Sequence, residues 1–146
     1  MKKIVLSLTL VASLYADHFN MPKTTNTTYQ NECGSCHMAF QPSFLNQGAW
    51  KKIMLNLNKH FEVDASLEQV DQQTILQYLM ENANSRLKNP NNEISITKLP
   101  WFMHEHKRLQ ARATANPKIK TLSNCMACHT RADKNDYDED NVRIPR

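Results

Sequence analysis

The pentapeptide Cys-x-x-Cys-His occurs twice in the 146-residue chain, at positions 33–37 and 125–129, and the two copies use all four cysteines. Two thiols on one short turn can form thioether bonds to the vinyl groups of a haem, and the adjacent histidine can then reach the iron as an axial ligand. The sequence therefore predicts two covalently bound haems c. The attachment sites are Cys33, Cys36, Cys125 and Cys128, and the proximal iron ligands are His37 and His129.

Other uses of paired cysteines fit this spacing less well. A zinc ribbon places its two Cys-x-x-Cys pairs about 15–20 residues apart, whereas 88 residues separate Cys36 from Cys125 here. Neither zinc nor a disulfide framework explains the histidine that follows each pair. A thioredoxin-like dithiol needs a strand, a helix and a second strand around the motif, and the flanking sequence does not offer them.

The first 16 residues have the pattern of a secretory signal peptide. Lys2 and Lys3 form a basic start, residues 4–14 form a short apolar stretch, and Ala16 offers a small residue for cleavage. The apolar stretch is shorter than the roughly 20 residues that span a bilayer, and no later stretch is longer. Because c-type haems are attached on the export side of a bacterial membrane, we expect a mature protein of residues 17–146 in the periplasm, without a transmembrane segment.

The charge and composition exclude several classes of partner. The formal net charge of the whole chain is +4, and removal of residues 1–16 lowers it to +2 before the haem propionates are counted. No run of Lys and Arg with interleaved aromatic residues is present, so we expect no nucleic-acid partner. The chain has two glycines, Gly34 and Gly48, which leaves no Gly-rich loop for binding phosphate.

Apolar residues recur at helical spacing, which favours an all-α fold whose core is built around the two covalently bound haems. One helix is expected between Phe44 and Phe61. A second helix is expected after Asp64 or Ser66, either of which can serve as its N-cap, and it should end by about Asn84.

The second half of the chain is expected to hold shorter elements. These are an extended piece at residues 94–97, a helix opened by Pro100 that runs through Leu109, and a short helix capped by Ser123 or Asn124 that carries the second motif. We expect one domain, with a first haem region at about residues 30–85 and a second at about 95–146.

A low-spin haem needs a second axial ligand, and four further histidines are present: His18, His60, His104 and His106. His18 lies next to the expected cleavage site, where a chain end is poorly ordered. His60 ends an amphipathic segment, where a histidine is often an ordinary helix-end cation. Two irons each need a second axial ligand, however, and we therefore predict that His60 is a distal ligand.

Helical phase separates the two remaining candidates. His106 would share a helix face with Phe102 and Leu109, whereas His104 would share its face with Arg108. An iron ligand should lie on the apolar, buried face. We therefore predict His106 as the other distal ligand and assign His104 to the solvated side.

Sequence distance favours a local pairing of these ligands. His60 follows His37 by 23 residues, and His106 precedes His129 by 23 residues. The local pairing joins His37 with His60 and His106 with His129. A crossed pairing, which would tie the two halves together through the irons, is the alternative.

Methionine is the chief rival as distal ligand, because His/Met ligation raises the potential of a haem. Met54 and Met80 fall on apolar helical faces, where a methionine more often fills a core. Met38 and Met126 lie beside or within the haem motifs, and Met103 is near the third expected helix. Bis-histidine ligation of both irons predicts a comparatively low-potential protein whose irons offer no free position to a substrate.

The chain resembles the small bacterial dihaem cytochrome c family of exported electron carriers. The residues that carry the resemblance are Cys33 to Met38, Trp50, His60-Phe61, Asp64-Ala65-Ser66-Leu67, Tyr78-Leu79, Ile96-Thr97, Pro100-Trp101-Phe102, Glu105-His106, Asn124 to His129 and Val142-Arg143-Ile144-Pro145. The resemblance implies bis-histidine, low-spin haems that relay electrons from a membrane quinol-linked cytochrome to a soluble acceptor, either a haem protein or a reductase. It also supports His106 over His104.

Two other functions are alternatives to a free electron carrier. The dihaem subunit of a periplasmic nitrate reductase would be part of an assembly rather than a free carrier. A haem peroxidase or gas sensor would need an open iron position, and the mature chain leaves little protein for a substrate pocket. We therefore expect an electron carrier and not an enzyme. Acidic residues gather after the second motif and indicate either a solvated tail or a docking patch for a basic redox partner: Asp133, Asp136, Asp138, Glu139 and Asp140.

Overall fold

The structure is a computed structural model, and it describes residues 22 and 24–146. The expected signal peptide at residues 1–16 and His18 lie outside the described residues. The α-helices are α1 (Thr27–Cys33), α2 (Gln47–Met54), α3 (Gln69–Asn82), α4 (Pro100–Glu105) and α5 (Gln110–Thr114). Single 3-10 turns are η1 (Pro42–Phe44), η2 (Leu57–Lys59), η3 (Ile96–Lys98), η4 (Cys125–Ala127), η5 (Ala132–Lys134) and η6 (Glu139–Asn141).

The described part of the chain is helical, which confirms the all-α fold. Its β-pairing consists of two isolated bridges, His60 with Val63 and His129 with Val142. In the described residues no helix is long and apolar enough to cross a membrane.

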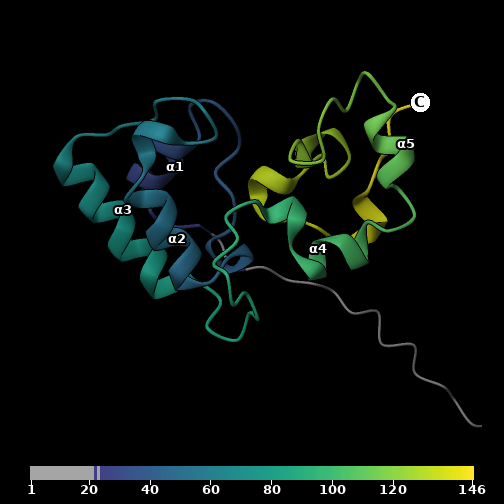
Figure 1. The fold of residues 1–146 in the computed structure, drawn as a ribbon. Helices are drawn as coiled ribbons and strands as arrows, with labels where there is room; N and C mark the ends of the chain where they lie inside the picture. Colours follow the sequence, from purple (N-terminus) through teal and green to yellow (C-terminus); the bar gives the residue numbers. More distant parts are fainter. Residues whose placement is uncertain (1–21, 23) are drawn as a thin grey trace, which may run out of the picture.

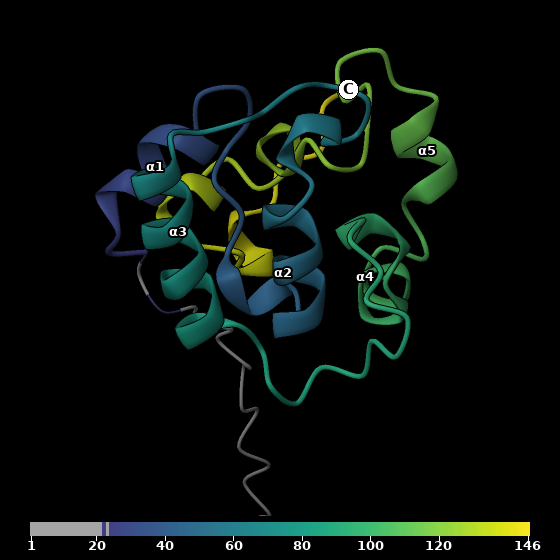
Figure 2. The ribbon, with the colours of Figure 1, turned by 60° about the vertical axis from the view of Figure 1, so that its left-hand side comes forward.

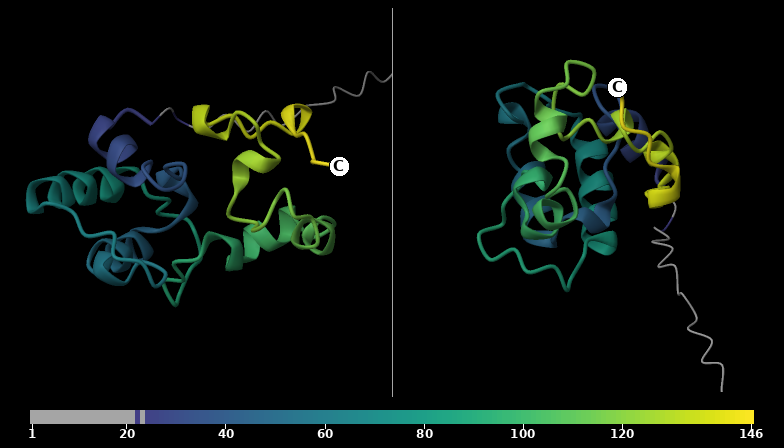
Figure 3. Two further views of the ribbon diagram at one scale, coloured as in Figure 1. Left: turned by 90° about the horizontal axis from the view of Figure 1, so that it is seen from above. Right: turned by 90° about the vertical axis from the view of Figure 1, so that its right-hand side faces the viewer.

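The helices form two groups that lie side by side (Figure 1). The first group contains α1, α2 and α3, and the second contains α4, α5 and the C-terminal turns. The view from above in Figure 3 shows the same separation, with the C-terminal segment returning toward the first group. In Figure 2 the C-terminal turns overlap the first group. The side chain of Asn135 donates a hydrogen bond to the hydroxyl of Thr24 at 3.3 Å, which joins the late part of the chain to its beginning.

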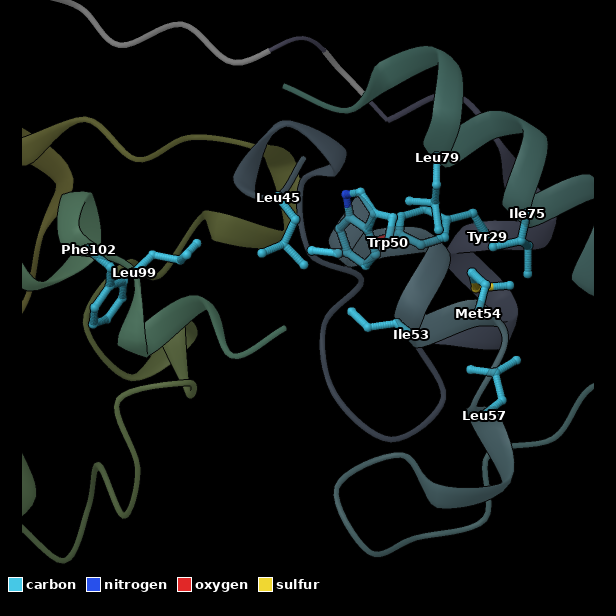
Figure 4. Packing of buried hydrophobic residues seen from close by; sticks show 11 residues of the cluster. Tyr29, Leu45, Trp50, Ile53, Met54, Leu57, Ile75, Leu79, Leu99 and Phe102 are labelled. Carbon is cyan, nitrogen blue, oxygen red and sulfur yellow. The ribbon is translucent and has the colours of Figure 1, made fainter. Parts of the chain in front are cut away.

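The main apolar core lies where α2 packs against α3. Trp50 and Met54 of α2 lie against Ile75 and Leu79 of α3, and Ile53 belongs to the same cluster (Figure 4). The indole N–H of Trp50 donates to the buried carbonyl of Pro42 at 2.7 Å, so the polar atom of this large side chain is satisfied inside the core. This core fixes α2 and the chain that follows it toward His60.

The cluster extends into the second group through α4. Leu99 and Phe102 belong to it and lie beyond Leu45 in Figure 4. Phe44 makes a second link, because its ring centre is 5.5 Å from that of Trp101 and 5.2 Å from that of Tyr137. These aromatic contacts hold the two groups against each other.

Several expected helix boundaries are wrong. The helix expected after residue 64 or 66 begins at Gln69, after an N-cap at Glu68 that makes no side-chain hydrogen bond. The carboxylate of Asp64 instead accepts hydrogen bonds from the backbone N–H and the hydroxyl of Ser66 at 2.9 and 2.6 Å. That local turn competes with capping of the helix, and α3 therefore starts later.

The elements of the second half are shorter than expected. The helix opened by Pro100 ends at Glu105 instead of continuing through Leu109, and a separate helix, α5, follows. Residues 96–98 form a 3-10 turn where an extended piece was expected. The second motif begins on the short 3-10 helix η4, whose N-cap position is Asn124, one of the two expected caps. Short turns of this kind depend on tertiary contacts more than on local periodicity.

Candidate functional site

The first motif begins at the end of α1. Cys33 is the last residue of that helix, and Gly34 closes it by donating its backbone N–H to the carbonyl of Gln30 at 3.0 Å. A Cβ atom at Gly34 would collide with that carbonyl oxygen, so only glycine allows the chain to turn this tightly. The turn brings His37 to lie 4.9 Å, between ring centres, from Phe40. Its Nδ1 is 2.8 Å from the carbonyl oxygen of Met38.

His60 faces His37 across the first site. The two ring centres are 6.3 Å apart and the ring planes are inclined at 30°. His60 follows η2 and is held by a tight turn in which the N–H of Val63 donates to the carbonyl of His60 at 3.0 Å. Phe61 and Glu62, at the centre of that turn, have φ angles of 48° and 71°. Non-glycine residues in this region cost of order 1–3 kcal/mol each, and such strain is found where the surrounding structure fixes a functional residue.

His106 and His129 form the corresponding pair in the second half. Their ring centres are 6.1 Å apart, and their planes are inclined at 68°. His106 directly follows α4 and stacks on Phe102 at 4.0 Å with an angle of 12°. Its Nδ1 lies 3.0 Å from the carbonyl oxygen of Phe102, one helical turn earlier. The expected shared face of Phe102 and His106 is therefore present although α4 ends before His106.

The second motif is fixed by the last part of the chain. The N–H of His129 donates to the carbonyl of Cys125 at 2.8 Å, which closes the motif on itself. Arg143 donates its backbone N–H to the carbonyl of Cys128 at 2.8 Å, and Val142 is bridged to His129. The segment after the acidic residues thus returns to support the motif.

Both pairs have the spacing that two ligands on opposite sides of one iron require. An imidazole nitrogen lies about 2.0–2.1 Å from a bound metal such as zinc, so imidazoles on either side of a metal place their ring centres about 6 Å apart. No cluster of three or more His, Cys, Asp or Glu side chains that could hold a metal occurs among the described residues. Each pair accordingly offers two protein donors, which suits a metal whose other ligands come from a porphyrin.

Burial favours the neutral form of His60 and His129, which is the form of imidazole that binds a metal. Burial, and then the facing His37, lower the pKa of His60 below its ordinary value. Burial also lowers the pKa of His129, with a further lowering from His106 and an opposing influence from Asp136. In each pair the facing ring therefore favours the uncharged form.

The four cysteines are free thiols, as addition of S–H across a haem vinyl group requires. Burial, together with the nearby carboxylate of Glu32, raises the pKa of the Cys33 thiol to about 11. Burial raises the pKa of Cys125 to about 11 as well. Each motif therefore has cysteines that are at least partly accessible: Cys36 is exposed, and Cys33, Cys125 and Cys128 are half-buried.

Exposed apolar side chains gather in the segments that carry these ligands. Phe61 and Val63 are 54% and 61% exposed, directly after His60, and Met126 is 39% exposed within the second motif. Leu55 and Met103 are also exposed, five residues before His60 and three before His106 in the sequence. Apolar surface next to metal ligands fits the two flat, apolar faces of a haem. On the chemistry of the donors and on this surface, the residues present fit two haems.

Three of the rival ligands, His104, Met54 and Met80, are either exposed or packed in the core. His104 is exposed on α4, as expected from its helical phase. Met54 is buried in the core between α2 and α3, and Met80 packs against the same core. The thioether sulfur of Met103 accepts a hydrogen bond from the side chain of Gln110. The structure brings His37 to His60 and His106 to His129, which is the local arrangement and not the crossed one.

Sequence reasoning missed the row of aromatic contacts that joins His129 to His106 within the second pair. Tyr137 lies 5.5 Å, between ring centres, from His129, and it also contacts Phe44. On the other side Phe44 contacts Trp101, which contacts Phe102 beneath His106. Tyr137 falls inside the acidic stretch, where no periodic pattern distinguishes a buried residue from a solvated one.

Comparison with known proteins agrees with this geometry. The family model described as dihaem cytochrome c matches residues 29–137. The solved structure of a dihaem cytochrome type c from Shewanella baltica OS155 has 36% sequence identity and a TM-score of 0.73, covering 82% of this chain and 93% of that one. Two structures of a dihaem cytochrome c from Rhodobacter sphaeroides have 31% identity each, with TM-scores of 0.66 and 0.72, covering 80% and 79% of this chain and 100% and 98% of theirs. The comparison with curated proteins found no match.

The chain belongs to the dihaem cytochrome c family. It is an electron-transfer haem protein with two c-type haems, which confirms the cofactors expected from the two motifs.

Proposed function

We propose that this protein is an exported periplasmic electron carrier in which His37 and His60 ligate the first iron and His106 and His129 the second. The observation that carries the proposal is the close approach of the two rings in each histidine pair, with ring centres 6.3 and 6.1 Å apart. Each pair contains one motif histidine and one histidine from a separate segment, so each iron would have both axial positions filled.

The haems supply reversible one-electron chemistry, and the protein controls where and how easily it happens. Filled axial positions leave no coordination site for a substrate, which favours electron transfer over catalysis at iron. Hydrogen bonds from Nδ1 of His37 and His106 to backbone carbonyls would leave Nε2 of each ring to bind iron and fix the ring orientation.

The proposed compartment and partners rest on the sequence and on the family resemblance. The signal-peptide pattern of residues 1–16 and the need for haem attachment after export support the periplasm. A membrane-bound cytochrome as donor and a soluble haem protein or reductase as acceptor follow from the resemblance to exported dihaem carriers. The carrier would accept one electron at a time and pass it on without chemical change of a substrate.

A potentiometric titration followed by low-temperature EPR tests the ligation. Both irons should be low spin in both oxidation states, and the reduced protein should not bind carbon monoxide. A high-spin signal that accounts for half of the iron would overturn the proposal and favour an enzyme or a sensor. Localisation is tested separately, because a spheroplast preparation should release the haem-stained protein with the periplasmic fraction.

A further inference from the structure

The hydrogen bonds of three proposed iron ligands are not alike. An iron-bound imidazole presents its second nitrogen as an N–H group, and proteins normally give that group an acceptor. His37 and His106 each have a backbone carbonyl at Nδ1, at 2.8 and 3.0 Å. Nδ1 of His129 is buried and has no hydrogen-bond partner among the described residues.

In the described part of the chain, one other buried side-chain polar atom lacks a hydrogen-bond partner, and it belongs to Tyr137, whose ring is next to that of His129. The hydroxyl of Tyr137 is buried without a hydrogen-bond partner. The rings of Tyr137 and His129 have centres 5.5 Å apart and planes inclined at 54°. Phe44 also packs edge-on against Tyr137, with ring centres 5.2 Å apart, which helps to fix the phenol ring.

The two atoms are chemically complementary. Nδ1–H of a ligating histidine can only donate, and a phenol oxygen has lone pairs that accept. A buried polar group without a partner is unfavourable, so two such groups on adjacent rings are expected to satisfy each other. The two atoms make no direct hydrogen bond in the structure, so their bond needs a shift of one ring or one buried water that joins them.

We propose that the Tyr137 hydroxyl accepts the hydrogen bond from Nδ1–H of His129 and so acts as the positioning residue for the proximal ligand of the second iron. The proposal rests on the proposed function, in which His129 binds that iron. The bond would fix the imidazole orientation and increase electron donation from His129 to the iron.

The proposed hydrogen bond should change the reduction potential of the second haem in one direction. More electron donation from the ligand stabilises the ferric state and lowers the reduction potential. Removing the acceptor should therefore raise the potential of the second haem. In Tyr137→Phe we expect about a tenfold change in the equilibrium constant for reducing that haem, which is about 59 mV for a one-electron couple. The first haem should keep its potential.

The test uses the purified protein with both haems, titrated potentiometrically while the two EPR signals are followed separately. Tyr29→Phe is the matched control, because it removes another buried phenol hydroxyl, one that donates to the carbonyl of Phe40 on the side of the first haem. This control should leave the potential of the second haem unchanged. The reduced wild-type protein is diamagnetic and permits NMR, where the Nδ1 proton of His129 should show a cross-peak to ring protons of Tyr137.

The outcomes separate the possible errors. A lowered potential of the second haem in Tyr137→Phe would mean that the hydroxyl donates to a haem propionate instead, and it would overturn the proposal. An unchanged potential of the second haem in Tyr137→Phe would also overturn the proposal. If that variant fails to fold, the NMR measurement on the wild-type protein decides, and a missing cross-peak between His129 and Tyr137 would overturn the proposal. If the wild-type protein lacks low-spin, bis-histidine spectra, the proposed function has failed before the tyrosine is tested.

Discussion

The imidazole rings of His106 and His129 face each other with centres 6.1 Å apart and planes inclined at 68°. The rings of His37 and His60 lie at nearly the same separation, 6.3 Å, but their planes are inclined at only 30°. An axial imidazole donates π-electron density perpendicular to its own plane. Nearly parallel rings therefore act on one iron d orbital, whereas nearly perpendicular rings act on two d orbitals alike.

We expect this difference to appear in the oxidised protein as two unlike low-spin EPR signals of equal intensity. The first iron should give the ordinary rhombic signal, because parallel rings separate its d orbitals in energy. The second should give a more anisotropic signal with a larger maximum g value. Low-temperature EPR with spin quantitation measures both. Two identical rhombic signals would contradict the ring orientation at the second site.

The two haem motifs could be predicted from the sequence, whereas the pairing of each motif histidine with a distant histidine was harder to predict. The two motifs are local, because every residue of a pentapeptide is positioned by its neighbours. His106 was selected by its shared face with Phe102, and the structure does stack these rings. The distance between a motif histidine and its partner depends on packing between distant segments, so the sequence alone left the local and the crossed pairing open.

The boundaries of the helices and the role of Tyr137 could not be anticipated. Helix α4 ends at Glu105 although the apolar pattern continues to Leu109, because a pattern does not record where tertiary contacts end a helix. Tyr137 stands alone among acidic residues, and its contact with Phe44 joins positions far apart in sequence. A lone aromatic residue in a polar segment carries no signal of burial.

The motif cysteines can be tested one at a time. Cys36→Ala and Cys128→Ala each remove one thioether, so we expect reduced haem incorporation at the affected site and normal incorporation at the other. Haem is counted by the pyridine haemochrome assay and located by mass spectrometry of haem peptides. Ser35→Ala, a change at a variable position of the first motif, is the control. Retention of two normally attached haems in either cysteine variant would contradict the attachment sites.

The core between α2 and α3 is expected to support the first site mechanically. Leu79 is fully buried there, and Leu79→Ala should lower the free energy of unfolding by about 2–5 kcal/mol. Val70 is the second residue of the same helix but is 68% exposed, so Val70→Ala should change stability by about 0.5 kcal/mol or less. Urea unfolding followed by far-UV circular dichroism compares the two. Equal effects would mean that the α2 and α3 contact contributes little to stability.

The proposed distal ligands make the sharpest test of the ligand pairing. His60→Ala should open only the first iron, and His106→Ala only the second, because each removes one of the two rings that face each other. In each variant about half of the iron should become high spin or bind carbon monoxide. The ordinary rhombic EPR signal should disappear in the first variant and the more anisotropic signal in the second.

His104→Ala is the matched control for His106→Ala. His104 lies two residues earlier on α4, and its side chain is exposed instead of stacked on Phe102. The His104→Ala variant should keep both EPR signals and both reduction potentials unchanged, because His104 belongs to neither histidine pair. Should His104→Ala open an iron while His106→Ala does not, the choice between these two histidines is wrong. Should His60→Ala instead open the haem attached at Cys125 and Cys128, the ligands of the two irons are crossed.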